Sequence, residues 1–332
     1  MVNTSLRSAL PGAQETTHQK DLTEILQGLA LPQKMLLPKF FYDARGSALF
    51  EAICQLEEYY LTRTELRIMQ TNIAHIAALA GPQVSVIEFG SGSSMKTRIL
   101  LQHLDRPAAY VPVDISGDHL RAVAGALAAD FPQLEILPIA ADFTRPFPLP
   151  QPRVPPLRNL VYFPGSTIGN FSPQSAHELL QVMHQEAGQD GALLIGVDLK
   201  KDPLVLQRAY NDSAGVTAQF NLNVLRRINR EFGADFDLAG YRHRAIWNET
   251  YGRIEMHLVS LRDQRVRLGG RQLQIRRGEF IVTEYSHKYS QEQFRVMAGA
   301  AGFRVTETWT DANCWFGVHY CQRCDPPNPG AG

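Results

Sequence analysis

Short apolar runs alternate with helix-like segments through the middle of the chain. Residues 84–89 form an apolar run that leads into a glycine-rich turn, and 95–104 follow with helical character. A second run, 109–113, ends on Asp114, a helix-like segment covers 118–131, and a third run, 134–141, ends on Asp142. Short apolar runs indicate buried strands, and helices between them indicate parallel pairing. The pattern therefore predicts an α/β fold with a doubly wound sheet.

Later segments extend this sheet. Apolar runs at 158–163 and 191–197 predict two more strands, and 149–156 is a proline-rich surface loop leading into the first of them. A helix predicted at 291–301 is followed by apolar runs at 303–310 and 315–321. We expect these last two strands to close the sheet as an antiparallel pair.

A different pattern predicts a second domain. Residues 21–80 are largely helical with a break at 36–43, and 204–231 are also helical. Strand-like runs follow at 255–262, 271–275 and 279–283, with a turn at Gly269-Gly270. We expect a sheet domain at 81–200 plus 286–322, and an α+β substrate-binding domain at 21–80 plus 201–285. Residues 1–20 and 325–332 are predicted to be disordered.

Composition excludes several classes of function. The 332 residues are 44% hydrophobic, and the 33 basic side chains balance the 33 acidic ones. Without excess positive charge, nucleic acid and anionic membranes are poor partners. No apolar run approaches the ~20 residues that cross a bilayer, and 1–19 lack the layout of a signal peptide. We expect a cytoplasmic monomer that acts on a small molecule.

The cysteines and histidines do not indicate a metal site. Cys54, Cys314, Cys321 and Cys324 are too few for a disulfide framework at this length. The last two have metal-ligand spacing but no second ligand pair, so we interpret them as inert. The ten histidines show no convincing ligand spacing. No metal is predicted.

The turn after the first strand favours one adenosine ligand over others. Glycines let a ligand approach the backbone, and Asp114 at the tip of the second strand suits ribose hydroxyls. Gly90-x-Gly92 lacks the third glycine of a dinucleotide loop, and Glu88 would repel a pyrophosphate. S-adenosylmethionine, a cation without phosphate, fits better. A nicotinamide or flavin site and a turn without a ligand remain alternatives.

An acid and an aromatic residue follow the third predicted strand. Asp142 and Phe143 stand where methyltransferases hold adenine, with the carboxylate on the exocyclic amine and the ring against the base. Taken alone, Asp142 would be interpreted as a turn or helix-capping residue. Its place after a third successive strand favours the binding role.

Four stretches of sequence together resemble a known family. They are 41–47 with 58–63, the glycine loop 87–97, the run Phe163-Pro-Gly-Ser-Thr-Ile-Gly-Asn170 with Phe171, and 284–286. They resemble the L-histidine Nα-methyltransferases of ergothioneine biosynthesis, from about residue 36 to 320. The resemblance implies a class I, Rossmann-like methyltransferase fold. It also implies S-adenosylmethionine-dependent trimethylation of L-histidine to hercynine, without a metal.

The resemblance also implies roles for individual residues. The methyl donor would be held by Tyr42, Gly90, Lys96, Asp114, Asp142 and Phe143. The substrate would be held by Tyr59, Gly165, Asn170, Tyr210, Met256, Glu284 and Ser286. Within that set, Glu284 and Ser286 would hold the imidazole, and Tyr59 is preferred over its neighbour Tyr60. Tyr42, Tyr59 and Asn170 would contribute to catalysis, with Tyr42, Tyr59 and water as candidate bases.

Physical reasoning on the same residues leaves rivals open. Asn170 can both donate and accept, which suits an amino acid's ammonium and carboxylate, whereas Tyr210 alone would be interpreted as a core residue. A buried Glu284 needs a donor such as an imidazole N–H. That need argues against a tyrosine or tryptophan methyltransferase of the same family. A nicotinamide oxidoreductase and a non-catalytic scaffold are the rivals from other classes.

Overall fold

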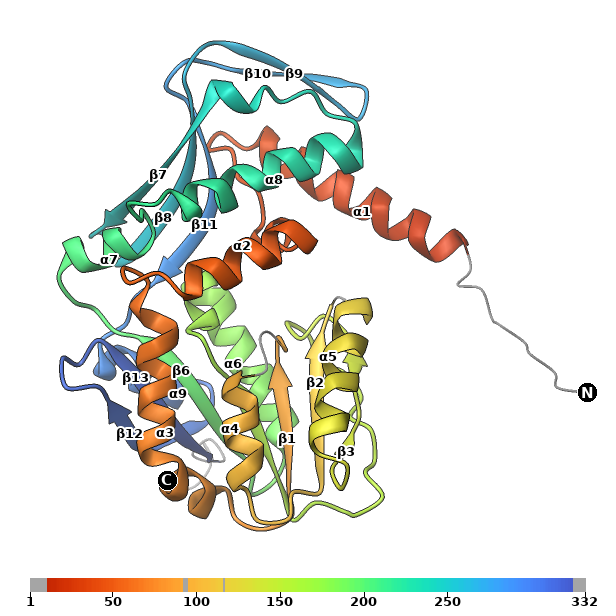
Figure 1. Cartoon of the computed structure of the whole chain (residues 1–332), viewed down its shortest axis with the longest axis vertical. Helices are drawn as coiled ribbons and strands as arrows, with labels where there is room; N and C mark the ends of the chain where they lie inside the picture. The colour runs from red at the N-terminus through yellow and green to blue at the C-terminus, as the bar shows by residue number, and fades with distance from the viewer. Residues whose placement is uncertain (1–10, 92–94, 116, 325–332) are drawn as a thin grey trace, which may run out of the picture. The chain divides into compact units, whose positions relative to one another are not determined.

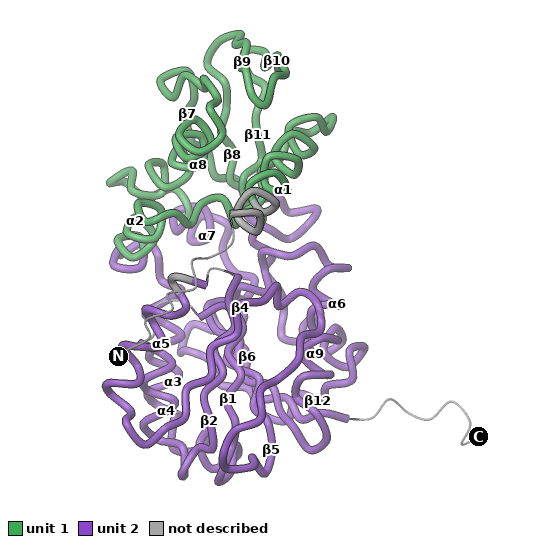
Figure 2. Tube along the Cα trace, turned by 90° about the vertical axis from the view of Figure 1, so that its right-hand side faces the viewer, with its two compact units in different colours: residues 1–53, 210–246, 255–285 green, residues 54–209, 247–254, 286–332 purple. Residues whose placement is uncertain are grey.

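The computed structural model describes residues 11–91, 95–115 and 117–324. The predicted disordered segments 1–10 and 325–332 lie outside these residues, as does Gly92 of the glycine loop. The chain divides into two compact units (Figure 2). Unit 1 contains residues up to 53, 210–246 and 255–285, and unit 2 contains 54–209, 247–254 and the residues from 286 onward.

Unit 2 is built on one mixed sheet. Its strands are β1 (Val84–Phe89), β2 (Ala109–Asp114), β3 (Glu135–Ile136), β4 (Ile139–Ala140), β5 (Arg158–Phe163), β6 (Ala192–Asp198), β12 (Phe303–Thr310) and β13 (Phe316–Arg323). They lie in the order β12-β13-β6-β5-β1-β2-β3, with β4 also paired to β2. The pairs from β6 to β3 are parallel, while β13 is antiparallel to β6 and to β12. The predicted doubly wound sheet and its antiparallel closing pair are confirmed.

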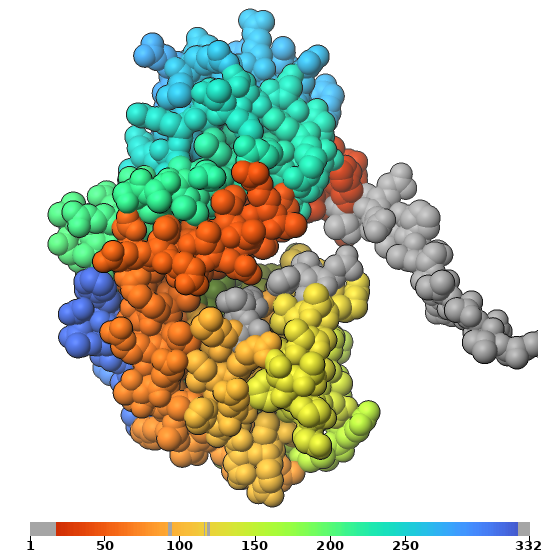
Figure 3. Space-filling view, viewed as in Figure 1, coloured from red at the N-terminus to blue at the C-terminus, as the bar shows by residue number. Residues whose placement is uncertain are grey.

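Helices cover both faces of this sheet. They are α3 (Tyr60–Ala80), α4 (Met95–His103), α5 (Gly117–Asp130), α6 (Pro173–Ala187), α7 (Pro203–Ala209) and α9 (Gln291–Ala300), with the 3-10 helix η2 (Thr167–Asn170) after β5. Figures 1 and 2 show α3, α4 and α5 on one face and α6 and α9 on the other. Figure 3 shows α3, α4 and α5 side by side at the surface. All six residues of β1 are buried, as expected for a strand covered on both faces.

Two segments of regular structure are more broken than their patterns indicate. The predicted third strand at 134–141 is two short strands, β3 and β4, separated by Leu137 and Pro138. Proline has no backbone N–H for the ladder, which explains the break. The predicted helix at 204–231 is also divided. Asp212 accepts the N–H groups of Val216 and Thr217, and this turn starts a new helix, α8 (Val216–Phe232).

Unit 1 combines helices with two small sheets. Its helices are α1 (Pro11–Ala30), η1 (Pro38–Phe41), α2 (Ala44–Cys54), α8 and η3 (Leu238–Gly240). Strands β7 (Tyr241–Asn248), β8 (Arg253–Ser260) and β11 (Phe280–His287) form a three-stranded sheet in the order β11-β8-β7, and β9 (Gln264–Leu268) pairs with β10 (Arg271–Ile275). Gly269 and Gly270 join β9 to β10 with positive φ angles, as a tight hairpin turn requires. The sequence pattern did not indicate β7 or β9.

The observed division differs from the expected domains at three places. Helix α3 belongs to unit 2, although 21–80 were assigned to the other domain. Helix α7 and residues 247–254 also belong to unit 2, although 201–285 were assigned to the other domain. At the N-terminus, α1 already begins at Pro11, so 11–20 are helical where disorder was expected. An amphipathic helix does not reveal in its own sequence which core it packs against.

Candidate functional site

The predicted loops meet at the carboxyl edge of the parallel strands in unit 2. From β1 the chain runs outward through β2 to β3, and then returns to β5 on the other side of β1. This reversal is the switch point at which open α/β sheets bind their ligands. Gly90 follows β1, Asp114 is the last residue of β2, and Gly165 lies in the loop after β5. The topology therefore brings these three residues to one edge.

Gly90 and Phe143 are neighbours at this edge. Gly90 has φ +73° and donates its N–H to the carbonyl of Val113 at 2.8 Å. A Cβ on Gly90 would lie 3.6 Å from the Phe143 ring, so that ring lies against the turn. Phe143 also packs on Phe89 and Phe163, with ring centroids 5.7 and 6.1 Å apart. A half-buried glycine turn beside a fixed aromatic ring fits an adenosine ligand.

Two carboxylates flank this aromatic face. Asp114 is half-buried at the end of β2, and its carbonyl accepts the N–H of Ala141, which brings the third strand end beside it. Asp142 is exposed, and its Oδ1 accepts the N–H and hydroxyl of Thr144 at 3.0 and 2.6 Å. The side chain thus closes a turn, which is the local role considered for it from sequence.

Glu88 has an internal role that its sequence position does not reveal. One oxygen, Oε2, accepts the Tyr110 hydroxyl at 2.5 Å and the Thr97 hydroxyl at 2.7 Å. The side chain is 3% exposed. Burial raises its pKa from 4.5 to about 7, although the hydroxyls of Tyr110 and Thr97 and the charge of Lys96 oppose the shift. Glu88 therefore joins β1 to β2 and α4 beneath the glycine turn.

Lys96 and Gly165 are joined by a residue that the sequence analysis missed. Glu65 of α3 accepts the Nζ of Lys96 at 2.5 Å and the N–H of Gly165 at 2.9–3.0 Å. It is 1% exposed. A glutamate at a buried position of a long amphipathic helix was the available signal, because a buried carboxylate needs partners.

The loop that carries Asn170 is tightly held. Asn170 ends η2 and is half-buried. The imidazole Nδ1 of His287 donates to the carbonyl of Gly169 at 2.9 Å, and a Cβ on Gly169 would lie 2.7 Å from the carbonyl oxygen of His287. Earlier in the loop, Ser166 has φ +57°, and its hydroxyl accepts the N–H of Asp198. The backbone of this loop is fixed on both sides.

A buried charged network lies next to this loop. The Tyr60 hydroxyl donates to both oxygens of Asp198, and Lys288 Nζ donates to Asp198 Oδ2 at 2.7 Å and to the Ser286 hydroxyl at 2.8 Å. Burial would raise the pKa of Asp198, but Lys288 and Lys201 outweigh burial and lower it. The network engages Tyr60 and orients Ser286. Tyr59, which the family resemblance favours over Tyr60 for substrate binding, occupies the N-cap position of α3 and is 8% exposed.

The other predicted residues lie in unit 1. Tyr42 is 46% exposed and packs edge-on against Phe220. Glu284 is half-buried on β11, whereas Met256, on the neighbouring strand β8, is 2% exposed. Tyr210 is 5% exposed, just before the turn that leads to α8. A fixed aromatic cluster and a polar strand position are therefore available in this unit.

Polar side chains fix the backbone around these residues. Asn221 donates to Nδ1 of His243 at 2.9 Å, so His243 donates from Nε2 to the carbonyl of Tyr210. Burial lowers the pKa of His243, consistent with a neutral ring. The Thr283 hydroxyl donates to the side-chain Oδ1 of Asn221 at 2.7 Å and to the backbone carbonyl of Met256 at 3.1 Å. Asn221 and His243 thus position Tyr210 and Met256 without having been indicated by a sequence motif.

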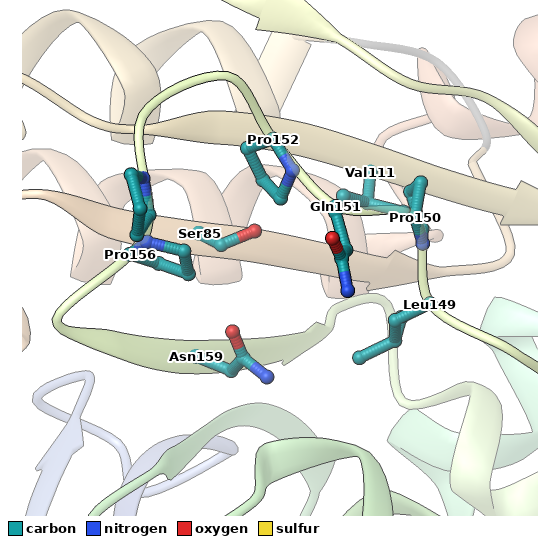
Figure 4. Close-up of a pocket in the computed structure, with 9 residues that line it drawn as sticks. Ser85, Val111, Leu149, Pro150, Gln151, Pro152, Pro156 and Asn159 are labelled. Atoms are coloured by element: carbon teal, nitrogen blue, oxygen red, sulfur yellow. The ribbon is translucent and has the colours of Figure 1, made fainter.

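A cavity of about 330 Å³ lies elsewhere in unit 2 (Figure 4). It is enclosed by the proline-rich loop, including Pro150 and Pro152, and by side chains of the sheet such as Ser85, Val111 and Asn159. Ser85 and Asn159 lie near the starts of β1 and β5, whereas the candidate site lies at their ends. The cavity is separate from the candidate site.

Within the described part of the chain, no helix combines the length and apolar character needed to cross a membrane. Across the same residues, no three His, Cys, Asp or Glu side chains are grouped so as to hold a metal ion. The sheet with its turns at the carboxyl edge, together with a match to a family of S-adenosylmethionine-dependent methyltransferases, defines the class of protein: an α/β methyltransferase that uses S-adenosylmethionine.

Comparison with known proteins narrows the class to a family. The family described as "Histidine-specific methyltransferase, SAM-dependent" matches residues 21–323. "Histidine N-alpha-methyltransferase" of Mycolicibacterium smegmatis is 41% identical, covering 90% of this chain and 94% of that protein, and its Mycobacterium tuberculosis counterpart is 39% identical, covering 89% and 92%. "Ergothioneine biosynthesis protein 1" of Neurospora crassa is 32% identical, covering 84% of this chain and 32% of that protein. The chain belongs to the histidine-specific, S-adenosylmethionine-dependent methyltransferases.

Proposed function

We propose that this enzyme transfers three methyl groups to the α-amine of L-histidine and releases hercynine, the first step of ergothioneine biosynthesis. The observation that carries the proposal is the family match over residues 21–323, which includes every predicted site residue. The named activity of the mycobacterial relatives and the pathway named for the Neurospora relative support it.

The methyl donor is assigned to one set of residues. Asp114 binds the ribose hydroxyls, Asp142 and Phe143 hold the adenine, and Gly90 leaves room for the ligand. Lys96 and Tyr42 complete the set, with Lys96 at the donor's carboxylate. When bound, S-adenosylmethionine supplies an electrophilic methyl group on a cationic sulfur. The half-buried edge position of Asp114 and the packed ring of Phe143 support these roles.

The substrate is assigned to a second set of residues. Tyr59, Asn170 and Tyr210 bind the α-amino and α-carboxylate groups, and the carbonyl of Gly165 lies near the reacting amine. Glu284 and Ser286 bind the imidazole, with Met256 packing nearby. Engagement of the Tyr60 hydroxyl with Asp198 at 2.8 Å supports Tyr59, rather than Tyr60, as the substrate tyrosine. A carboxylate at position 284 favours an imidazole, which can donate an N–H and carry a positive charge, over a neutral aromatic ring.

The reaction requires alignment and loss of protons. Histidine enters as an ammonium, which must lose a proton before its lone pair can attack. The new C–N bond forms as the C–S bond breaks, and the electron pair stays on sulfur. Over three transfers the substrate loses three protons and keeps one positive charge. Tyr42, Tyr59 or water would accept these protons, and alignment of the reacting pair contributes up to ~7–11 kcal/mol.

Product analysis tests the proposal directly. The purified protein, incubated with L-histidine and S-adenosylmethionine, should yield mono-, di- and trimethylhistidine, resolved by mass spectrometry with fragmentation that places every methyl on the α-nitrogen. Activity should persist in EDTA. Methylation of the ring, preferential methylation of tyrosine or tryptophan, or loss of activity in EDTA would contradict the proposal.

We also propose that the enzyme works in the cytoplasm as a monomer. The absence of excess positive charge, which would attract nucleic acid or an anionic membrane, and the small-molecule substrate support the cytoplasmic assignment. Light scattering coupled to gel filtration should give a mass close to the 37.1 kDa of one chain. A stable dimer would contradict the monomer assignment.

A further inference from the structure

Glu65 is a buried carboxylate whose two oxygens both have partners. It projects from α3 and is 1% exposed, so its charge would be costly without compensation. Lys96 Nζ donates to Oε2 at 2.5 Å, and the N–H of Gly165 lies 3.0 Å from Oε1 and 2.9 Å from Oε2. One carboxylate therefore bridges the first turn of α4 and the loop after β5.

Two glycines make this bridge sterically feasible. A Cβ at Gly196 of β6 would lie 2.1 Å from Glu65 Oε1, so any side chain at this position would displace the carboxylate. Gly165 has φ +82°, a conformation that side-chain-bearing residues rarely adopt, and a Cβ there would lie 3.7 Å from Lys96 Nζ. Gly196 therefore leaves room for the carboxylate, and Gly165 allows the backbone conformation of the loop that donates to it.

The two groups that Glu65 holds serve opposite sides of the reaction. In the proposed function, on which this inference rests, Lys96 binds the methyl donor and Gly165 presents its carbonyl near the acceptor amine. An ammonium has three N–H donors, and Glu65 directs one of them, which orients the other two. Accepting the Gly165 N–H likewise fixes the peptide before Gly165. Both orientations depend on one side chain.

We propose that Glu65 is a positioning residue that couples the methyl-donor site to the acceptor loop. It does not touch the reacting atoms. It holds Lys96 and Gly165 in a fixed mutual geometry, so that the donor methyl and the acceptor nitrogen are aligned for in-line transfer. A misplacement of about 1 Å in such an arrangement can cost about 10²-fold in rate.

Glu65→Gln separates the two contacts. The amide oxygen can still accept the Gly165 N–H, but the amide nitrogen cannot accept from the Lys96 ammonium. We expect kcat for histidine methylation to fall by about 10- to 100-fold, while KM for both substrates changes by less than about threefold, the signature of an interaction used in the transition state. The matched control is Glu186→Gln, a buried glutamate that accepts the N–H of Phe147 on the opposite face of the sheet. It should keep wild-type kcat.

A second measurement needs only S-adenosylhomocysteine. In the wild type, its binding should slow hydrogen exchange in the peptide containing 163–170, because Lys96 and that loop share Glu65. In Glu65→Gln the ligand should still bind, but this protection should be lost. Failure of wild-type histidine turnover would refute the proposed function and leave this test intact. Unchanged kcat in Glu65→Gln, or ligand-induced protection equal to that of the wild type, would overturn the positioning role.

Discussion

The buried Glu88 carboxylate should make the stability of this enzyme depend on pH, and a single substitution tests it. Both hydroxyls that Glu88 accepts, from Tyr110 and Thr97, reach the same oxygen. Glu88→Gln therefore keeps an oxygen for both donors and removes the titrating group. Burial raises the pKa of Glu88 from its ordinary value of 4.5 to about 7 in the folded chain. The folded state therefore binds the carboxyl proton of Glu88 more tightly than the unfolded state does.

The sign and size follow from that difference. The neutral form of Glu88 is favoured in the folded state. Its contribution to the free energy of unfolding is therefore fully present below pH 4.5 and is lost as the pH rises to about 7. A difference of this size corresponds to about 3 kcal/mol. For a protein region of about 200 residues, this equals roughly 6–12 °C in Tm. The loss should be present in the wild type and absent in Glu88→Gln.

Thermal unfolding at pH 5 and pH 8 provides the assay. About 2.5 kcal/mol of the loss falls between these two pH values, so the difference in Tm between them should be smaller in Glu88→Gln than in the wild type by roughly 5–10 °C, with the variant the more stable protein at pH 8. Glu178→Gln, an exposed glutamate on α6, is the control and should follow the wild type. Parallel pH profiles for wild type and Glu88→Gln would refute the reasoning that burial controls this carboxyl group.

Two further predictions concern the ligand sites. Asp114→Ala should weaken S-adenosylhomocysteine binding by roughly one to two decades, because hydrogen bonds to a charged group contribute ~1.5–3 kcal/mol, with little change in Tm; unaltered affinity by calorimetry would remove Asp114 from the donor site. Glu284→Ala should lower kcat/KM for histidine much more than it lowers affinity for the methyl donor, because an imidazole N–H is then buried without an acceptor. Adding Met256→Val to this variant should favour tryptophan over histidine as the substrate. If the ratio of kcat/KM for histidine and tryptophan stays constant, the assignment of the side-chain pocket is wrong.

Much of unit 2 could be predicted from local sequence patterns. The run 158–163 is β5 at the same bounds, and the second strand ends on Asp114 as expected. Strands buried on both faces are apolar throughout, so their limits are visible in a single sequence. Because parallel strands end at one edge, the order of motifs along the chain also predicted which loops would meet. Unit 1 was harder, because β7 shows neither a continuous apolar run nor a regular alternation of polar and apolar residues, and only Tyr241 and Ala245 of its eight residues are buried.

Some candidate residues have hydrogen-bond partners that the sequence pattern did not indicate. Asp142 was expected at the end of a strand, and the structure adds a turn closed by Thr144. The choice between Tyr59 and Tyr60 was open in sequence, because adjacent tyrosines look alike there. Tyr60 pairs with Asp198, 138 positions away. No local pattern could predict that pairing.

The sequence by itself determined the class of fold, the family and the positions of the ligand-binding loops, because these depend on local periodicity and on motifs within short stretches. Only the tertiary structure decided how the buried charges are paired. Glu65 meets Gly165 across 100 positions, and Lys288 meets Asp198 on a different strand. Burying a charge is costly without a partner of matching geometry. That partner is determined by which segments the sheet brings together, and so it is a property of the folded chain.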